Sequence, residues 1–163
     1  MLNAVVILCG GLTSSLASGF ICDKFESRNI RIKSHVCTFL SFMGVPCFLL
    51  IFLIHSNFYV ALGILFLQNL LSEGWMAPSI AMIQTVIDVK YKAVSVAVFF
   101  FATAISQTIA AVVLGEIITK FELNSEKIGE LGLVLALFTA GPCLLASYCF
   151  YKCGKPYEDF KAL

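Results

Sequence analysis

The chain has 163 residues, of which 60% are hydrophobic and 13% are charged, and its formal net charge is +1. Its mean hydropathy is +0.94. A soluble domain carries about a quarter charged residues, so this composition indicates an integral membrane protein embedded in a lipid bilayer. The basic residues flank apolar segments and form no face with exposed aromatic side chains, so no nucleic-acid partner is expected.

Five apolar segments are long enough to cross a bilayer core of about 30 Å. They predict an all-α membrane protein with spans over about residues 2–21, 34–54, 57–87, 91–119 and 129–151. Together these spans form one transmembrane five-helix bundle over residues 1–152, and residues 153–163 form a short tail. The first segment is interpreted as a span and not as a signal peptide, because no basic residue precedes Leu2.

The distribution of lysine and arginine predicts the orientation of the spans. One side of the predicted bundle carries Lys24, Arg28, Arg31, Lys33, Lys90, Lys92, Lys152, Lys155 and Lys161. The other side carries Lys120 and Lys127. Because basic loops stay in the cytoplasm, we expect an extracytoplasmic N-terminus and a cytoplasmic C-terminus, in a membrane that the sequence does not identify. Met1 leads directly into a span, so we expect the chain to be part of a longer protein.

The predicted spans differ in polarity. The first, third and fourth contain several hydroxyl, amide or carboxyl side chains, whereas the second and fifth contain few strong hydrogen-bonding side chains. Polar side chains within a membrane face other helices or a cavity. We therefore expect the first, third and fourth spans to line an interior and the second and fifth to face lipid.

Glu73 is the most informative single residue, because the third span places it near the bilayer midplane. An acidic side chain at that depth costs about 2.5–3.5 kcal/mol and is a functional candidate. On a helical wheel Asn69 and Gln84 lie on the same stripe as Glu73, and Gln107 of the fourth span reaches a similar depth. These four residues form either a substrate or ion pathway, with Glu73 as a protonatable or substrate-binding centre, or a packing contact around a neutral glutamic acid.

A helix kink is expected directly after Glu73. Pro78 cannot donate a hydrogen bond to the carbonyl of Gly74 and clashes with it. The kink is either a hinge beside the buried acid or a static bend, since proline is common in membrane helices.

No pattern in the sequence indicates catalysis, a cofactor or a metal. Most cysteines lie inside apolar segments, where a free thiol behaves as a small hydrophobic group. The two histidines, His35 and His55, have no ligand spacing. We find no catalytic constellation and no phosphate-binding glycine loop, so an enzyme is not expected.

The first loop carries a motif that resembles the major facilitator superfamily of transporters. Members of that family carry G-x-x-x-D-[RK]-x-G-[RK]-[RK] between helices two and three, with a weaker copy between helices eight and nine. Gly19, Asp23, Lys24 and Arg28 match, while Glu26 replaces the second glycine and Ser27 replaces a basic residue. These departures are typical of the second copy, so the five spans resemble helices eight to twelve. The stretch from Trp75 to Ala97 is also similar to Spinster-like lipid transporters.

The resemblance implies alternating access, in which two six-helix bundles rock around a central site. It assigns Gly19, Asp23, Lys24 and Arg28 to a cytoplasmic gating loop, and it implies an N-terminal helix bundle as a partner. The predicted function is therefore part of an ion-coupled secondary active transporter that moves a small organic or lipid-like solute. The alternative is a non-transporting membrane scaffold or assembly subunit, which would bury the stripe of Asn69, Glu73 and Gln84 within its own helices.

Overall fold

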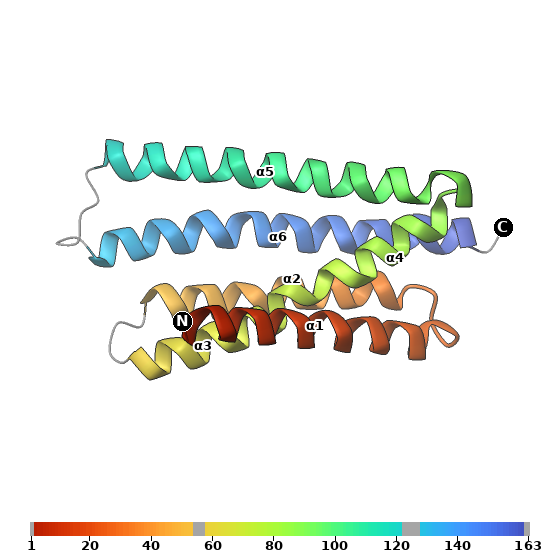
Figure 1. Cartoon of the computed structure of the whole chain (residues 1–163), viewed down its shortest axis with the longest axis horizontal. Helices are drawn as coiled ribbons and strands as arrows, with labels where there is room; N and C mark the ends of the chain where they lie inside the picture. The colour runs from red at the N-terminus through yellow and green to blue at the C-terminus, as the bar shows by residue number, and fades with distance from the viewer. Residues whose placement is uncertain (1, 54–57, 122–127, 162–163) are drawn as a thin grey trace.

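The computed structural model describes residues 2–53, 58–121 and 128–161, and every regular element in these ranges is helical. The elements are α1 (Leu2–Glu26), α2 (Ile32–Leu53), α3 (Phe58–Ser72), the 3₁₀ turn η1 (Glu73–Trp75), α4 (Met76–Val86), the 3₁₀ turn η2 (Val89–Tyr91), α5 (Lys92–Lys120) and α6 (Ile128–Lys161). Figure 1 shows the long helices running side by side, with the α1–α2 loop, the α4–α5 turn and the C-terminus at one end.

Four stretches within the described residues are long and apolar enough to cross a membrane: Ala4–Glu26, Ile32–Ile51, Val89–Lys120 and Leu131–Lys161. A helix suits this environment because it satisfies its own backbone polar groups where no water is present. The third predicted span is divided into α3, η1 and α4, so no single helix of that region reaches the length of the other four. The sequence analysis placed the end of the last span at residue 151, and the structure extends α6 to Lys161.

α2 and α6 form the most extensive helix contact, because small side chains let their backbones approach closely. Ser147 donates a hydrogen bond to the Thr38 carbonyl over 3.1 Å, and Ser34 donates one to the Phe150 carbonyl. A Cβ atom built at Gly154 would lie only 2.6 Å from Ser34 Oγ. The contact is therefore built on small residues.

The expectation that the second span lies on the lipid-facing periphery is wrong. Besides α6, α2 packs against α1, α3 and α4, and Cys37 and Cys47 are buried on it. The physical reason is that close packing between membrane helices depends on small residues as much as on strongly polar ones. Polarity alone therefore failed to identify α2 as the central helix.

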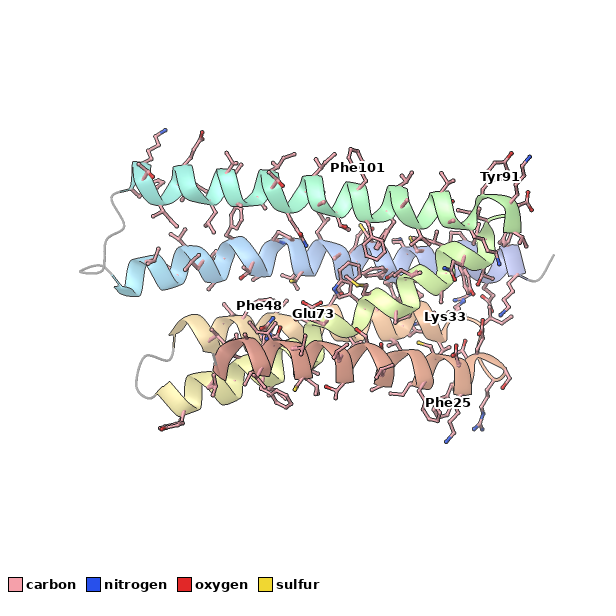
Figure 2. The ribbon with its side chains drawn as sticks, viewed as in Figure 1. Phe25, Lys33, Phe48, Glu73, Tyr91 and Phe101 are labelled. Atoms are coloured by element: carbon pink, nitrogen blue, oxygen red, sulfur yellow. The ribbon has the colours of Figure 1, made fainter. Side chains whose placement is uncertain are left out.

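The expectation that the fourth span lines an interior is also wrong for the described bundle. α5 has no buried residue, and Phe101 points away from the other helices (Figure 2). Its hydroxyl groups are satisfied within the helix: Thr103 donates to the Phe100 carbonyl over 2.8 Å and Ser106 to the Ala102 carbonyl over 2.9 Å. Because such local hydrogen bonds satisfy a hydroxyl, these side chains do not require an interior.

Candidate functional site

The interruption between α3 and α4 lies well inside the predicted span, after the 15 residues of α3 and before the 11 residues of α4. Glu73–Trp75 forms a 3₁₀ turn, in which the Met76 N–H donates to the Glu73 carbonyl. Gly74 lies inside this turn and Pro78 lies near the start of α4, at the kink expected from the sequence, and both are buried. Proline lacks the N–H that would continue the α-helical ladder to Gly74.

Side chains from three neighbouring helices hold the interruption in place. Ser14 of α1 donates a hydrogen bond to the Leu70 carbonyl. Ser79 of α4 donates to the Trp75 carbonyl over 2.7 Å, and the Cys37 thiol of α2 donates to the same oxygen over 3.5 Å. Backbone groups freed at a helix break need such partners away from water. The break is therefore supported by the surrounding helices.

The tight packing around Gly74 supports the same interpretation. A Cβ atom at this position would lie 2.7 Å from both Ser14 Oγ and Leu40 Cδ1. Such a distance is below ordinary contact, so a larger residue would displace these neighbours. Glycine allows α1 and α2 to approach the backbone of η1.

A cavity of about 370 Å³ lies beside the break, between α2, α3, η1 and α6. We call it the break cavity. Figure 2 labels two of its lining residues, Glu73 and Phe48, near the middle of the bundle. The complete lining is Ser41, Gly44, Phe48, Gln68, Ser72, Glu73, Trp75, Pro142, Cys143, Ala146 and Phe150.

Polar and aromatic groups share the wall of the break cavity. Gln68 donates a hydrogen bond to Ser72 Oγ over 2.8 Å. The Trp75 ring packs against Phe150, with centroids 6.0 Å apart and planes inclined at 45°. Glu73 is the one charged residue in the lining, and no ion pair or hydrogen bond of its carboxyl group occurs among the described residues. The lining of the cavity therefore combines one acidic residue with aromatic side chains.

Two other hollows are lined almost entirely by apolar atoms. One, of about 550 Å³, lies between α1, α2 and α3, and the other, of about 540 Å³, lies between α4, α5 and α6. Neither is lined by Asp, Glu, Lys or Arg, and His35 borders the first. Within the ranges that the structure describes, no three His, Cys, Asp or Glu side chains gather where they could hold a metal ion.

The structure keeps two of the four residues predicted for a substrate or ion pathway together and separates the other two. Asn69 and Glu73 both lie against α1, where Cβ atoms built at Gly10 and Gly11 would lie 3.1 Å from Asn69 Cβ and 3.8 Å from Glu73 Cγ. Of the four, Glu73 alone lines the break cavity. Asn69 is buried towards α1 beside Gly10, and its amide donates to the Leu65 carbonyl over 2.8 Å. Gln84 on α4 and Gln107 on α5 are exposed. The predicted stripe assumed an unbroken α-helix, whereas a 3₁₀ turn advances about 120° per residue and changes the direction of the side chains that follow.

The residues predicted for a gating loop lie at the end of the bundle that carries the C-terminus. Gly19 faces α4, since a Cβ there would lie 3.9 Å from the Ala77 Cβ. Asp23, Lys24 and Arg28 are exposed, and none of them takes part in an ion pair within the described part of the chain. No contact seen here assigns them a role.

Other charged residues of this end form an ion-pair network that the sequence analysis missed. We call it the loop-end cluster, and it comprises Glu26, Arg31, Lys33, Glu158 and Lys161. Glu26 pairs with Lys33, at 2.9 Å, and with Lys161, while Arg31 pairs with Glu158. Lys33 lies near this end of the bundle in Figure 2. The available signal was the charge-rich end of the last helix, which the sequence analysis treated as a tail.

Comparisons of the chain with protein-family models, with curated proteins and with solved structures find no match. The resemblance to the major facilitator superfamily thus rests on the sequence alone, chiefly on the motif in the first loop.

Proposed function

We propose that this chain is part of a secondary active transporter that moves a small organic or lipid-like solute by alternating access. The observation that carries the proposal is the break at Glu73–Trp75, which borders a cavity containing a carboxyl group. Interrupted helices of this kind form the substrate and ion sites of many transporters near the midplane. An unpaired acid in a membrane span is itself a functional candidate.

The arrangement of the helices around the break supports movement at this point. α3 packs against α1 and α2, whereas α4 also contacts α5. A change in the angle between α3 and α4 would therefore move α5 and alter the wall that η1 gives to the break cavity. Hinges between packed segments are a common means of opening and closing a site.

The proposal includes further helices from a longer protein, in agreement with the motif in the first loop. The supporting observation is that α5 has no buried residue among those described. A helix of this kind is available to contact both lipid and the other half of a transporter.

Cys143 offers a direct test, because its thiol lines the break cavity. In a variant with Cys143 as the one remaining cysteine, alternating access predicts labelling by a membrane-impermeant thiol reagent from either side of the membrane. The measurement compares intact cells with inside-out vesicles. A matched variant that retains only Cys47, which is buried on α2 outside the cavity lining, should remain unlabelled from both sides. Labelling of Cys143 from one side alone, or from neither, would contradict the proposal.

A non-transporting scaffold is the second candidate. It is favoured by the burial of Gln68 and Asn69, whose amide groups already donate to Ser72 and to the Leu65 carbonyl. The amide groups of these side chains have hydrogen-bond partners within the bundle, as expected for residues that stabilise helix packing. The scaffold predicts that Cys143 is sealed from both sides.

A further inference from the structure

We propose that the break cavity binds the positively charged group of an organic ammonium compound. In this proposal the Glu73 carboxylate supplies the opposite charge, and the rings of Phe48, Trp75 and Phe150 supply aromatic faces. The inference rests on the proposed function, because it assigns a chemical class to the solute of the same site.

The sign of the ligand charge follows from the lining. Glu73 is its one charged side chain, so no lysine or arginine neutralises the carboxylate there. Lys33, which is largely buried, pairs with Glu26 at the end of the bundle and is not part of the lining. An uncompensated carboxylate in a poorly solvated site attracts a cation and repels an anion.

The aromatic content of the wall favours an organic cation over a metal ion. Ammonium groups are attracted to the faces of tryptophan, tyrosine and phenylalanine within about 6 Å of the ring centroid. Three such residues, Phe48, Trp75 and Phe150, border the cavity. Hard metal ions such as Ca²⁺ require about six to eight oxygen ligands, and most of this lining is apolar or aromatic.

The size of the cavity restricts the ligand to a small molecule. Its volume of about 370 Å³ falls at the lower end of the range for small-molecule sites, which is about 300–1,000 Å³. The lining comes from α2, α3, η1 and α6, so the ligand would contact the end of α3 and the 3₁₀ turn itself. Binding would therefore act directly on the turn that joins α3 to α4.

Trp75 makes the proposal measurable, because it is the only tryptophan in the chain and it lines the cavity. The purified chain in an uncharged maltoside detergent is titrated with choline while Trp75 fluorescence is recorded. A parallel titration uses 3,3-dimethyl-1-butanol, which has the shape of choline without its charge. We expect a saturable change with choline and at least tenfold weaker binding of the neutral alcohol.

Variants at two acidic positions separate the site from general effects of charge. Glu73→Gln should weaken choline binding about tenfold and remove the preference over the alcohol, whereas Glu73→Asp should retain the preference. Glu116→Gln, at an exposed position on α5, should bind choline like the unmodified chain. Circular dichroism verifies that each variant keeps its helical content, and Glu73→Asp keeps the test decisive if Glu73→Gln fails to fold.

The outcomes also separate this inference from the proposed function. Absence of a saturable choline response, equal binding of the alcohol, or unchanged binding by Glu73→Gln would overturn the ammonium site. Labelling of Cys143 from both sides would still support transport of another solute in that event. Conversely, selective choline binding with a sealed Cys143 would support a binding site and contradict alternating access.

Discussion

The loop-end cluster and the break cavity both contain a glutamate, but only the glutamate of the loop-end cluster has ion-pair partners among the described residues. Glu26 contacts two lysines, and one of them, Lys33, has a side chain only 5% exposed. Glu73 has no basic partner among the described residues, although it lies deeper in the predicted span. The pairing of Glu26 is expected for a structural residue, because a buried charge without a partner is strongly destabilising. Glu73 remains uncompensated within the protein, which is typical of residues kept for function.

The largest difference in stability is expected when a glutamate is replaced by glutamine in each of the two regions. Glu26→Gln leaves Lys33 buried without a carboxylate and should destabilise the fold by about 3 kcal/mol, the scale for breaking a buried pair. Glu73→Gln removes an unpaired charge and should leave stability unchanged or slightly increased. The measurement is the free energy of unfolding from SDS titrations followed by Trp75 fluorescence. A similar loss in both variants would show that Glu73 is a structural residue.

Gly154 provides the next test, because the loop-end cluster depends on the contact between α2 and α6. In Gly154→Ala the added methyl group would meet Ser34 Oγ at 2.6 Å and Ser34 Cβ at 3.1 Å. The required shift should destabilise the chain by about 1–3 kcal/mol, measured by the same titration. Gly63→Ala is the matched control, since no atom lies within 4 Å of its added methyl group. Equal effects of the two substitutions would contradict the close approach of α2 and α6.

The smallest effect is expected at the outer pair of the loop-end cluster. The side chains of Arg31 and Glu158 are 38% and 36% exposed, and such pairs contribute about 0–1 kcal/mol. Glu158→Gln should therefore cost less than 1 kcal/mol, and this cost should fall further in high salt because exposed pairs are screened. A loss as large as that of Glu26→Gln would show that the cluster acts as one cooperative unit.

The sequence predicted the helical character of the chain well, because long apolar segments have few alternatives in a membrane. The predicted range 34–54, for example, became α2 over Ile32–Leu53. The arrangement of the helices was harder to predict. Small residues such as Ser34 and Gly154 determine the α2–α6 contact, and they carry little signal in a hydropathy profile.

The candidate site was predicted only in part, for reasons of geometry. Glu73 was singled out from its predicted depth in the membrane, and the structure places it in the lining of the break cavity. Gln107 was grouped with it on depth alone, which gives no information on the direction or neighbours of a side chain. The loop-end cluster depends on contacts between residues more than a hundred positions apart, such as Arg31 and Glu158, and a single sequence does not reveal such pairs.

The length of α6 has a mechanical consequence. Its 34 residues extend about 51 Å, whereas the hydrocarbon core of a bilayer is about 30 Å thick. A helix of this length adapts to a thinner or thicker membrane by changing its tilt. The ion pair of Glu158 with Arg31 joins the end of α6 to the loop before α2, and that of Lys161 with Glu26 joins it to the end of α1. α2 in turn contacts the break through Cys37. A change in the tilt of α6 would therefore be passed through α2 to the helix break.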